Sequence, residues 1–191
     1  MNPFFNIYIG PMFGAKTTRL LADIDRLKYK GRKVIAFKPN VDKRYSLDKI
    51  SSHNNGTIEA HCIDNAKEIL DIIQNNNNSV DTIAVDEAFM ISGIDDILID
   101  LYKKGYNIII ASIQMDANEK PFENIKNLLP WGTKIEVCPA VCTMCDNDAY
   151  FTEALFDIDN ASQEEKIGGK NMYEPRCAKH YKAFKKIKEN L

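Results

Sequence analysis

Short apolar runs alternate along the first 138 residues with segments in which apolar residues recur every three or four positions. The runs predict buried strands at Phe4–Ile9, Val34–Phe37, Thr82–Val85, Asn107–Ala111 and Ile135–Val137. The segments between them predict amphipathic helices from Leu20 to Leu27, Ala66 to Ile73, Ile94 to Leu101 and Phe122 to Leu129. Continuous apolar strands separated by helices predict an α/β fold, a parallel sheet flanked by helices on both faces.

Two longer stretches have neither pattern and are predicted to be loops, Asn40–Thr57 and Gln114–Lys120. Loops of this size inside a compact unit are often functional.

Composition limits the class of protein. The 191 residues are 45% hydrophobic and 27% charged, which is typical of a globular chain with a real core. A formal net charge of −2 gives no electrostatic reason to expect a nucleic-acid or membrane partner. No apolar stretch approaches the roughly 20 residues that span a bilayer. With a strand predicted close to Met1, we expect no targeting peptide and a cytoplasmic protein.

The first predicted strand leads into a glycine-bearing turn that ends in Lys-Thr and is followed by a helix. This order is the context of a phosphate-binding P-loop, in which backbone N–H groups and the helix N-terminus face phosphate oxygens. The predicted loop consists of Gly10, Pro11, Met12, Phe13, Gly14, Ala15, Lys16, Thr17 and Thr18. Lys16 is expected to reach the β and γ phosphates, and the Thr17 hydroxyl to ligate Mg²⁺. Ala15 stands where the pattern has glycine, and its Cβ would crowd a phosphate or disfavour the required backbone angle.

Asp86 and Glu87 follow the strand Thr82–Val85 directly. Ligands of open α/β sheets bind at the carboxyl ends of the strands, so these carboxylates are expected beside the phosphate loop. Asp86 suits Mg²⁺ and Glu87 suits a general base toward an acceptor hydroxyl. The alternative is an ordinary acidic pair at a strand end.

Beyond residue 138 the character of the sequence changes, and we expect residues 1–138 and 139–191 to be separate domains. Cys142 and Cys145 form one x₂ pair, and Cys177 and His180 form another. Two such pairs predict a tetrahedral, structural Zn²⁺ site with no open position. The alternative is unrelated buried or reactive cysteines. The remaining cysteines, Cys62 and Cys138, are expected to be small core residues.

Taken in order, the motifs of this chain resemble those of the thymidine kinases that combine a P-loop α/β domain with a zinc-bearing lasso domain. The resemblance rests on Gly10–Phe13, Asp42–Tyr45 with His53, Asp86–Ala88, Lys120–Phe122, Ala140–Cys145, Ile167–Gly169 and Tyr173–His180. It implies ATP-dependent phosphorylation of the 5′-hydroxyl of thymidine, or of deoxyuridine, with catalytic Mg²⁺, structural Zn²⁺ and a homotetrameric assembly.

The resemblance also implies roles for individual residues. Glu87 is the implied base, with Lys16 and Arg44 as further catalytic residues and Asp42 near the acceptor hydroxyl. Thymine would lie among the side chains of Met12, Ile113, Phe122 and Tyr173, and main-chain groups around Ile167, Gly168 and Gly169 would read its polar edge.

The chain also departs from the family pattern, at Ala15, Phe89, Gln114, Ala117 and Ala154. Two alternatives to an active thymidine kinase therefore stay open. One is a degenerate homologue that binds nucleotides with little or no turnover, and the other is a zinc-ribbon nucleic-acid binder, which the lack of basic excess disfavours.

Overall fold

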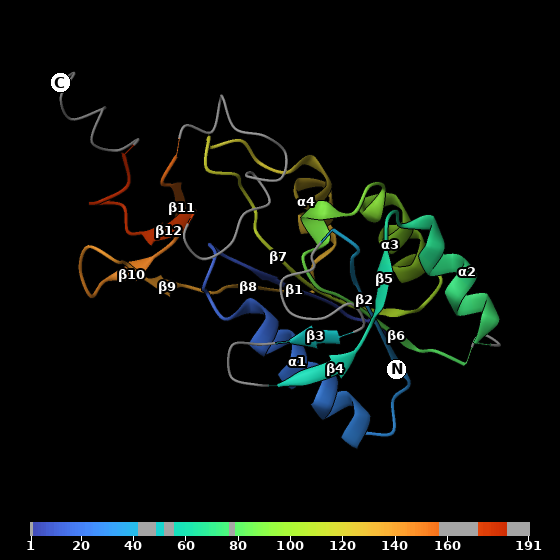
Figure 1. Cartoon of the computed structure of the whole chain (residues 1–191). Helices are drawn as coiled ribbons and strands as arrows, with labels where there is room; N and C mark the ends of the chain where they lie inside the picture. The colour runs from blue at the N-terminus through green and yellow to red at the C-terminus, as the bar shows by residue number, and fades with distance from the viewer. Residues whose placement is uncertain (1, 42–48, 52–55, 77–78, 157–171, 183–191) are drawn as a thin grey trace.

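The computed structural model describes residues 2–41, 49–51, 56–76, 79–156 and 172–182 (Figure 1). Five residues to which the resemblance assigns roles lie outside the described residues: Asp42, Arg44, Ile167, Gly168 and Gly169. His53, one of the residues that carry the resemblance, lies outside them as well.

A six-stranded parallel sheet forms the centre of the molecule (Figure 1). Its strand order is β5-β2-β6-β7-β1-β8, and every neighbouring pair is parallel. The strands are β1 (Phe5–Ile9), β2 (Val34–Pro39), β5 (His61–Ile63), β6 (Thr82–Val85), β7 (Asn107–Ser112) and β8 (Lys134–Val137). All residues of β6 and β7 are buried, as expected of parallel strands covered on both faces.

Helices cover both faces of the sheet, which confirms the predicted α/β class. The helices are α1 (Lys16–Tyr29), α2 (Lys67–Asn75), α3 (Ile94–Lys103) and α4 (Glu123–Leu128), with 3-10 turns η1 (Ala88–Met90) and η2 (Leu129–Trp131). Alternate strand residues face opposite sides. In β7, Ile108 and Ile110 pack in one cluster with α2, α3 and α4, whereas Ile109 packs in a second cluster with α1.

One prediction about local structure was wrong in part, and one strand of the sheet was missed. The stretch Asn40–Thr57 was expected to be a loop, but it contains β3 (Lys49–Ser51), which pairs antiparallel with β4 (Thr57–Glu59). Ile50 is buried on the α1 side of the sheet, and the half-buried Ile58 of β4 packs against the same cluster, so these residues dock the hairpin. The edge strand β5 was also missed, because three residues carry too little periodicity to be recognised.

Four short strands follow the sheet and build the C-terminal part of the described chain. They are β9 (Ala140–Val141), β10 (Asp148–Ala149), β11 (Phe151–Ala154) and β12 (Tyr173–Arg176). β9 pairs with β10, and β11 pairs with β12, both antiparallel. Whether the chain divides into domains at residue 138 stays a prediction. Among the described residues, none of the helices has the length and apolar character needed to cross a membrane.

Candidate active site and metal centre

The predicted phosphate loop follows β1 and runs closely past the backbone of Cys138. A Cβ added to Gly10 would lie 2.2 Å from the Cys138 carbonyl oxygen, and one added to Gly14 would lie 2.4 Å from the same atom. Both separations are far below van der Waals contact, so only glycine fits at these two positions. Cys138 itself is fully buried as predicted, whereas Cys62 is only half-buried in the edge strand β5.

Ala15, the departure from the glycine pattern, adopts a left-handed conformation with φ 55° and ψ 25°. Phe13, two residues earlier in the loop, is also left-handed, with φ 66°. For a residue with a Cβ this conformation costs about 1–2 kcal/mol relative to the right-handed region. The angle that alanine disfavours is therefore present in this loop.

The loop leads directly into α1, whose N-terminus is open to an anion. No side chain among the described residues caps α1, and its first turn contains no acidic residue. The positive end of the helix and its first N–H groups therefore favour a bound negative charge. Lys16 is buried in this turn, and its ammonium donates to the Pro11 carbonyl oxygen at 2.6 Å, folding back across the loop.

Thr17 lies next to the carboxylate that follows β6. Its hydroxyl oxygen is 3.1 Å from each carboxylate oxygen of Asp86, which is itself buried. A hydroxyl and a carboxylate at this separation are oxygen ligands that suit Mg²⁺. The donor set therefore fits the predicted cation.

Glu87 is partly exposed and left-handed, with φ 50°, immediately before η1. Neighbouring elements fix this turn. The N–H of Phe89 donates to the buried Ser112 hydroxyl at the end of β7, at 3.2 Å. The amide of Asn124, on α4, donates to the Phe89 carbonyl at 3.2 Å. The second carboxylate therefore has a defined place at the carboxyl edge of the sheet, close to Asp86.

The four described side chains predicted to surround a nucleoside come from different elements. The Phe122 ring packs on Phe89, with centroids 4.6 Å apart, and Tyr173 packs edge-on against Phe156 at 5.4 Å. Met12 lies in the loop after β1, and Ile113 follows β7; both are half-buried. Burial and the charge of Asp116 raise the pKa of Tyr173, which indicates that the Gln114–Lys120 segment lies near β12.

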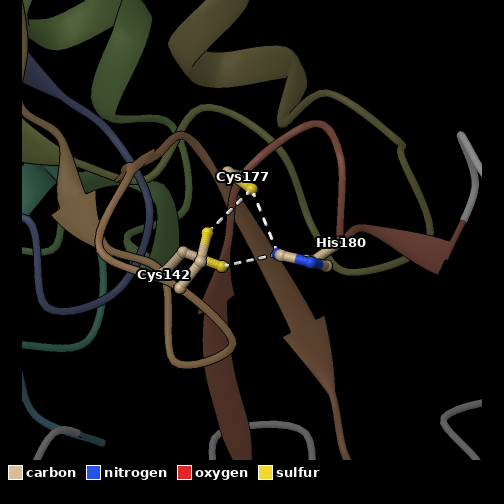
Figure 2. Close-up of side chains that lie close together, drawn as sticks. Cys142, Cys177 and His180 are labelled. Carbon is tan, nitrogen blue, oxygen red and sulfur yellow. Dashed lines mark hydrogen bonds between the residues drawn. The ribbon is translucent and has the colours of Figure 1, made fainter.

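The predicted metal ligands come together at the C-terminal end of the described chain. The ligand atoms of Cys142, Cys145, Cys177 and His180 all lie within 4.8 Å of one another. Figure 2 shows Cys142 and Cys177 directed toward the His180 ring, whose Nδ1 is 3.6 Å and 3.5 Å from their sulfurs. The Cys145 and Cys177 sulfurs are 3.8 Å apart.

These separations fit zinc. In a tetrahedral site with Zn–S near 2.3 Å and Zn–N near 2.0 Å, two sulfurs lie about 3.8 Å apart and a sulfur and a nitrogen about 3.5 Å apart. Burial opposes ionisation of the Cys142 thiol, but the backbone N–H groups of Cys177 and Met144 outweigh it and lower its pKa. The thiolate is the form of cysteine that binds a metal, and a lowered pKa favours it.

A buried ion pair beside this cluster was not found from the sequence. Arg176 Nε lies 2.9 Å from Glu153 Oε2, and both side chains are 7% exposed. Arg176 also pairs with Glu174 at 2.5 Å and contacts the Thr143 hydroxyl. Hydrogen bonds from Thr143 and Arg176 lower the pKa of Glu174. Glu153 and Arg176 are 23 positions apart, and no periodic pattern links them in the sequence.

Comparison with known proteins gives the family of this chain. A family model described as thymidine kinase matches residues 4–181. A thymidine kinase from Pyrobaculum aerophilum is 33% identical over 179 residues, which cover 92% of this chain and 96% of that protein. The chain therefore belongs to the thymidine kinase family, as the order of its motifs predicted.

Proposed function

We propose that this protein transfers the γ-phosphoryl group of ATP to the 5′-hydroxyl of thymidine, or of deoxyuridine as its close analogue. Family membership supports a nucleoside kinase. The observation that carries the proposal is the contact between Thr17 and Asp86 at the open N-terminus of α1, with Glu87 next in the chain. Three elements of phosphoryl transfer are thereby close together: an anion site, a cation ligand pair and a second carboxylate.

The phosphates of ATP lie in the Gly10–Thr18 loop under this proposal. The N–H groups at the start of α1 bind phosphate oxygens, and Lys16 exchanges its bond to the Pro11 carbonyl for the β and γ phosphates. Thr17 and Asp86 would hold Mg²⁺, which when bound would neutralise charge on the phosphates.

Glu87 accepts the proton of the 5′-hydroxyl as the hydroxyl oxygen bonds to the γ phosphorus. The bond between that phosphorus and the β–γ bridging oxygen breaks, and ADP leaves with the electron pair. Because little covalent chemistry is required of the protein, positioning and charge stabilisation supply most of the rate. Arg44 and Asp42, implied by resemblance, would act near the transferred group from outside the described residues.

The nucleoside is assigned to the side chains of Met12, Ile113, Phe122 and Tyr173. The main chain of Ile167–Gly169, outside the described residues, would read the polar edge of the base. Backbone groups in a tied-down loop can discriminate a base edge because an unmatched partner leaves them unpaired. A homotetramer in the cytoplasm remains the expectation from resemblance, and sedimentation of the purified protein would measure the assembly.

A second candidate function is a nucleotide-binding homologue with little or no turnover. The observation that favours it is the left-handed Ala15, because backbone strain in the phosphate loop can displace the N–H groups that contact phosphate. A coupled assay with Mg·ATP and each of the four deoxynucleosides separates the two. Thymidine-dependent ADP release that depends on Glu87 supports the kinase, and ATP binding without any such release supports the homologue.

A further inference from the structure

The phosphate loop packs directly against the metal centre. The Phe13 side chain, in the middle of the loop, contacts a buried cluster made of Ala140, Cys142, Ala149 and Cys177. Two of these four residues are metal ligands of the predicted site. Because Phe13 is left-handed, with φ 66°, its conformation persists only where the surroundings fix it. The residues of the metal centre are part of those surroundings.

A hydrogen bond ties the loop to the same part of the chain. The N–H of Met12 donates to the hydroxyl of Thr152 at 3.1 Å, between residues 140 positions apart. Thr152 is buried on β11, where it pairs with Pro175 of β12, two residues before the ligand Cys177. Two consecutive loop residues, Met12 and Phe13, are therefore fixed by the β9–β12 region, one by its backbone and one by its ring.

The Glu153 carboxylate fixes β11 to the segment that carries two metal ligands. One of its oxygens accepts from Arg176 Nε at 2.9 Å, and the other accepts from the backbone N–H of Lys182 at 3.1 Å. Cys177 and His180 lie between these two contacts. A displacement of the ligand segment is therefore passed to Glu153 and to its neighbour Thr152.

We propose that the metal centre sets the conformation of the Gly10–Thr18 loop, with Phe13 and Thr152 as the positioning residues. Metal binding holds Phe13 and Met12 in place and so prepares the loop for phosphates, which lowers the ordering cost of binding. The part that concerns nucleotide rests on the proposed function. By linkage, bound nucleotide must in turn strengthen metal binding by the same factor.

Amide hydrogen exchange of the full chain tests the coupling without any nucleotide. The readout is protection of the Gly14 and Arg19 amides, which donate to the carbonyl oxygens of Pro11 and Ala15. It is compared in zinc-loaded protein and after a zinc-selective chelator, with α2 as the internal control. We expect loop protection to fall at least severalfold while α2 stays protected. Unchanged loop protection after metal removal overturns the proposal.

Variants of the zinc-loaded protein decide the matter if metal removal unfolds the sheet as well. Thr152→Val removes the hydroxyl at similar volume and Phe13→Leu removes the ring, whereas Thr152→Ser keeps the hydroxyl. The first two should lower protection of the Gly14 and Arg19 amides at unchanged zinc content, and Thr152→Ser should keep it. Equal protection in all four proteins overturns the proposal.

Mg·ADP binding gives the second, separate readout. Loss of the Thr152 hydroxyl should lower the affinity for Mg·ADP about two- to tenfold, the range for one hydrogen bond. Bound Mg·ADP should slow zinc extraction from the natural protein, and should slow it less from Thr152→Val, in which only the Phe13 contact remains. If Mg·ADP does not bind the natural protein, the proposed function fails, while the exchange result still decides the coupling. If Mg·ADP binds and chelation leaves its affinity unchanged in folded protein, the coupling fails.

Discussion

The Thr17 hydroxyl lies 3.1 Å from both carboxylate oxygens of Asp86, although the two residues are 69 positions apart. Thr17 lies in the first turn of α1 and Asp86 directly follows β6. The contact therefore depends on β6, β7 and β1 lying side by side in one parallel sheet. The fold thereby brings the two predicted cation ligands together.

Asp86→Asn should remove the negative ligand and keep the shape of the site. We expect Mg·ATP binding to weaken and turnover to fall at least tenfold, with partial recovery at high Mg²⁺, because an amide oxygen is a weaker ligand than a carboxylate for a hard cation. Titration of activity with Mg²⁺ measures both. Asp71→Asn, on the exposed face of α2, is the matched control. If the activity of Asp86→Asn depends on Mg²⁺ as that of the natural protein does, Asp86 is not a ligand of the cation.

Glu87→Gln tests the general base. Because glutamine and glutamate have nearly the same size, we expect nucleotide binding to persist. Turnover should fall about 10²–10⁴-fold, the usual contribution of a general base. Single-turnover phosphorylation of thymidine measures the chemical step, and Glu59→Gln on the exposed strand β4 is the control. Near-normal turnover would show that another group accepts the proton.

Ala15→Gly should stabilise the protein and strengthen its binding of ATP. Relief of the left-handed Cβ is worth about 1–2 kcal/mol, from which the larger unfolded-state entropy of glycine subtracts about 0.5–1 kcal/mol. The exposed Ala22 in α1 gives the opposite case, since Ala22→Gly should cost about 1 kcal/mol. Urea unfolding and ATP titration of both variants provide the measurement. A destabilised Ala15→Gly, or one that binds ATP as before, would show that the loop tolerates alanine without strain.

Much of this arrangement follows from local sequence signals. The β1–loop–α1 unit could be predicted because a strand, two required glycines and an amphipathic helix occur in unbroken order. The cluster of Cys142, Cys145, Cys177 and His180 could be predicted because each x₂ pair is a local unit. Both signals come from short stretches of sequence, where periodicity and spacing carry the information.

Contacts between distant segments could not be predicted in the same way. The Glu153–Arg176 pair, the Thr152 bond to Met12 and the packing of Phe13 on the cysteine cluster all join residues from different elements. Each depends on the relative placement of the elements, and no period or spacing records it. The β3–β4 hairpin was missed for a related reason, because only Ile50 of β3 is buried.

The metal centre should hold one Zn²⁺ per chain. Protein purified without added zinc should show a stoichiometry near one by elemental analysis. Cys177→Ser should lower that value and loosen nucleoside binding, because it removes a thiolate ligand and frees β12. Cys62→Ser, at a half-buried cysteine outside the cluster, should leave the zinc content unchanged. Full activity of a metal-free protein would contradict a structural role for the metal.

The last prediction concerns Ala117, where the resemblance implies a phenylalanine that stacks on the base. Ala117 is half-buried in the Gln114–Lys120 segment. The Asp116 carboxylate closes this segment by accepting from the N–H groups of Asn118 and Lys120, at 2.9 Å and 2.8 Å. The charge of Asp116 also contributes to the raised pKa of Tyr173. The segment therefore has a fixed shape and lies near one of the residues assigned to the nucleoside.

An alanine at this position leaves room on one face of the base, so we expect weaker thymidine binding than the family pattern gives and greater tolerance of bulky 5-substituted uridines. Ala117→Phe should strengthen thymidine binding about two- to tenfold, because an aromatic pair adds about 0.5–1.5 kcal/mol beyond area burial. It should also reduce binding of the bulky analogues. Asn118→Phe places the same ring on the exposed neighbouring position and should change neither. Equal thymidine affinity in Ala117→Phe, or preference for a purine in the natural protein, would show that the base lies elsewhere or that thymidine is not the substrate.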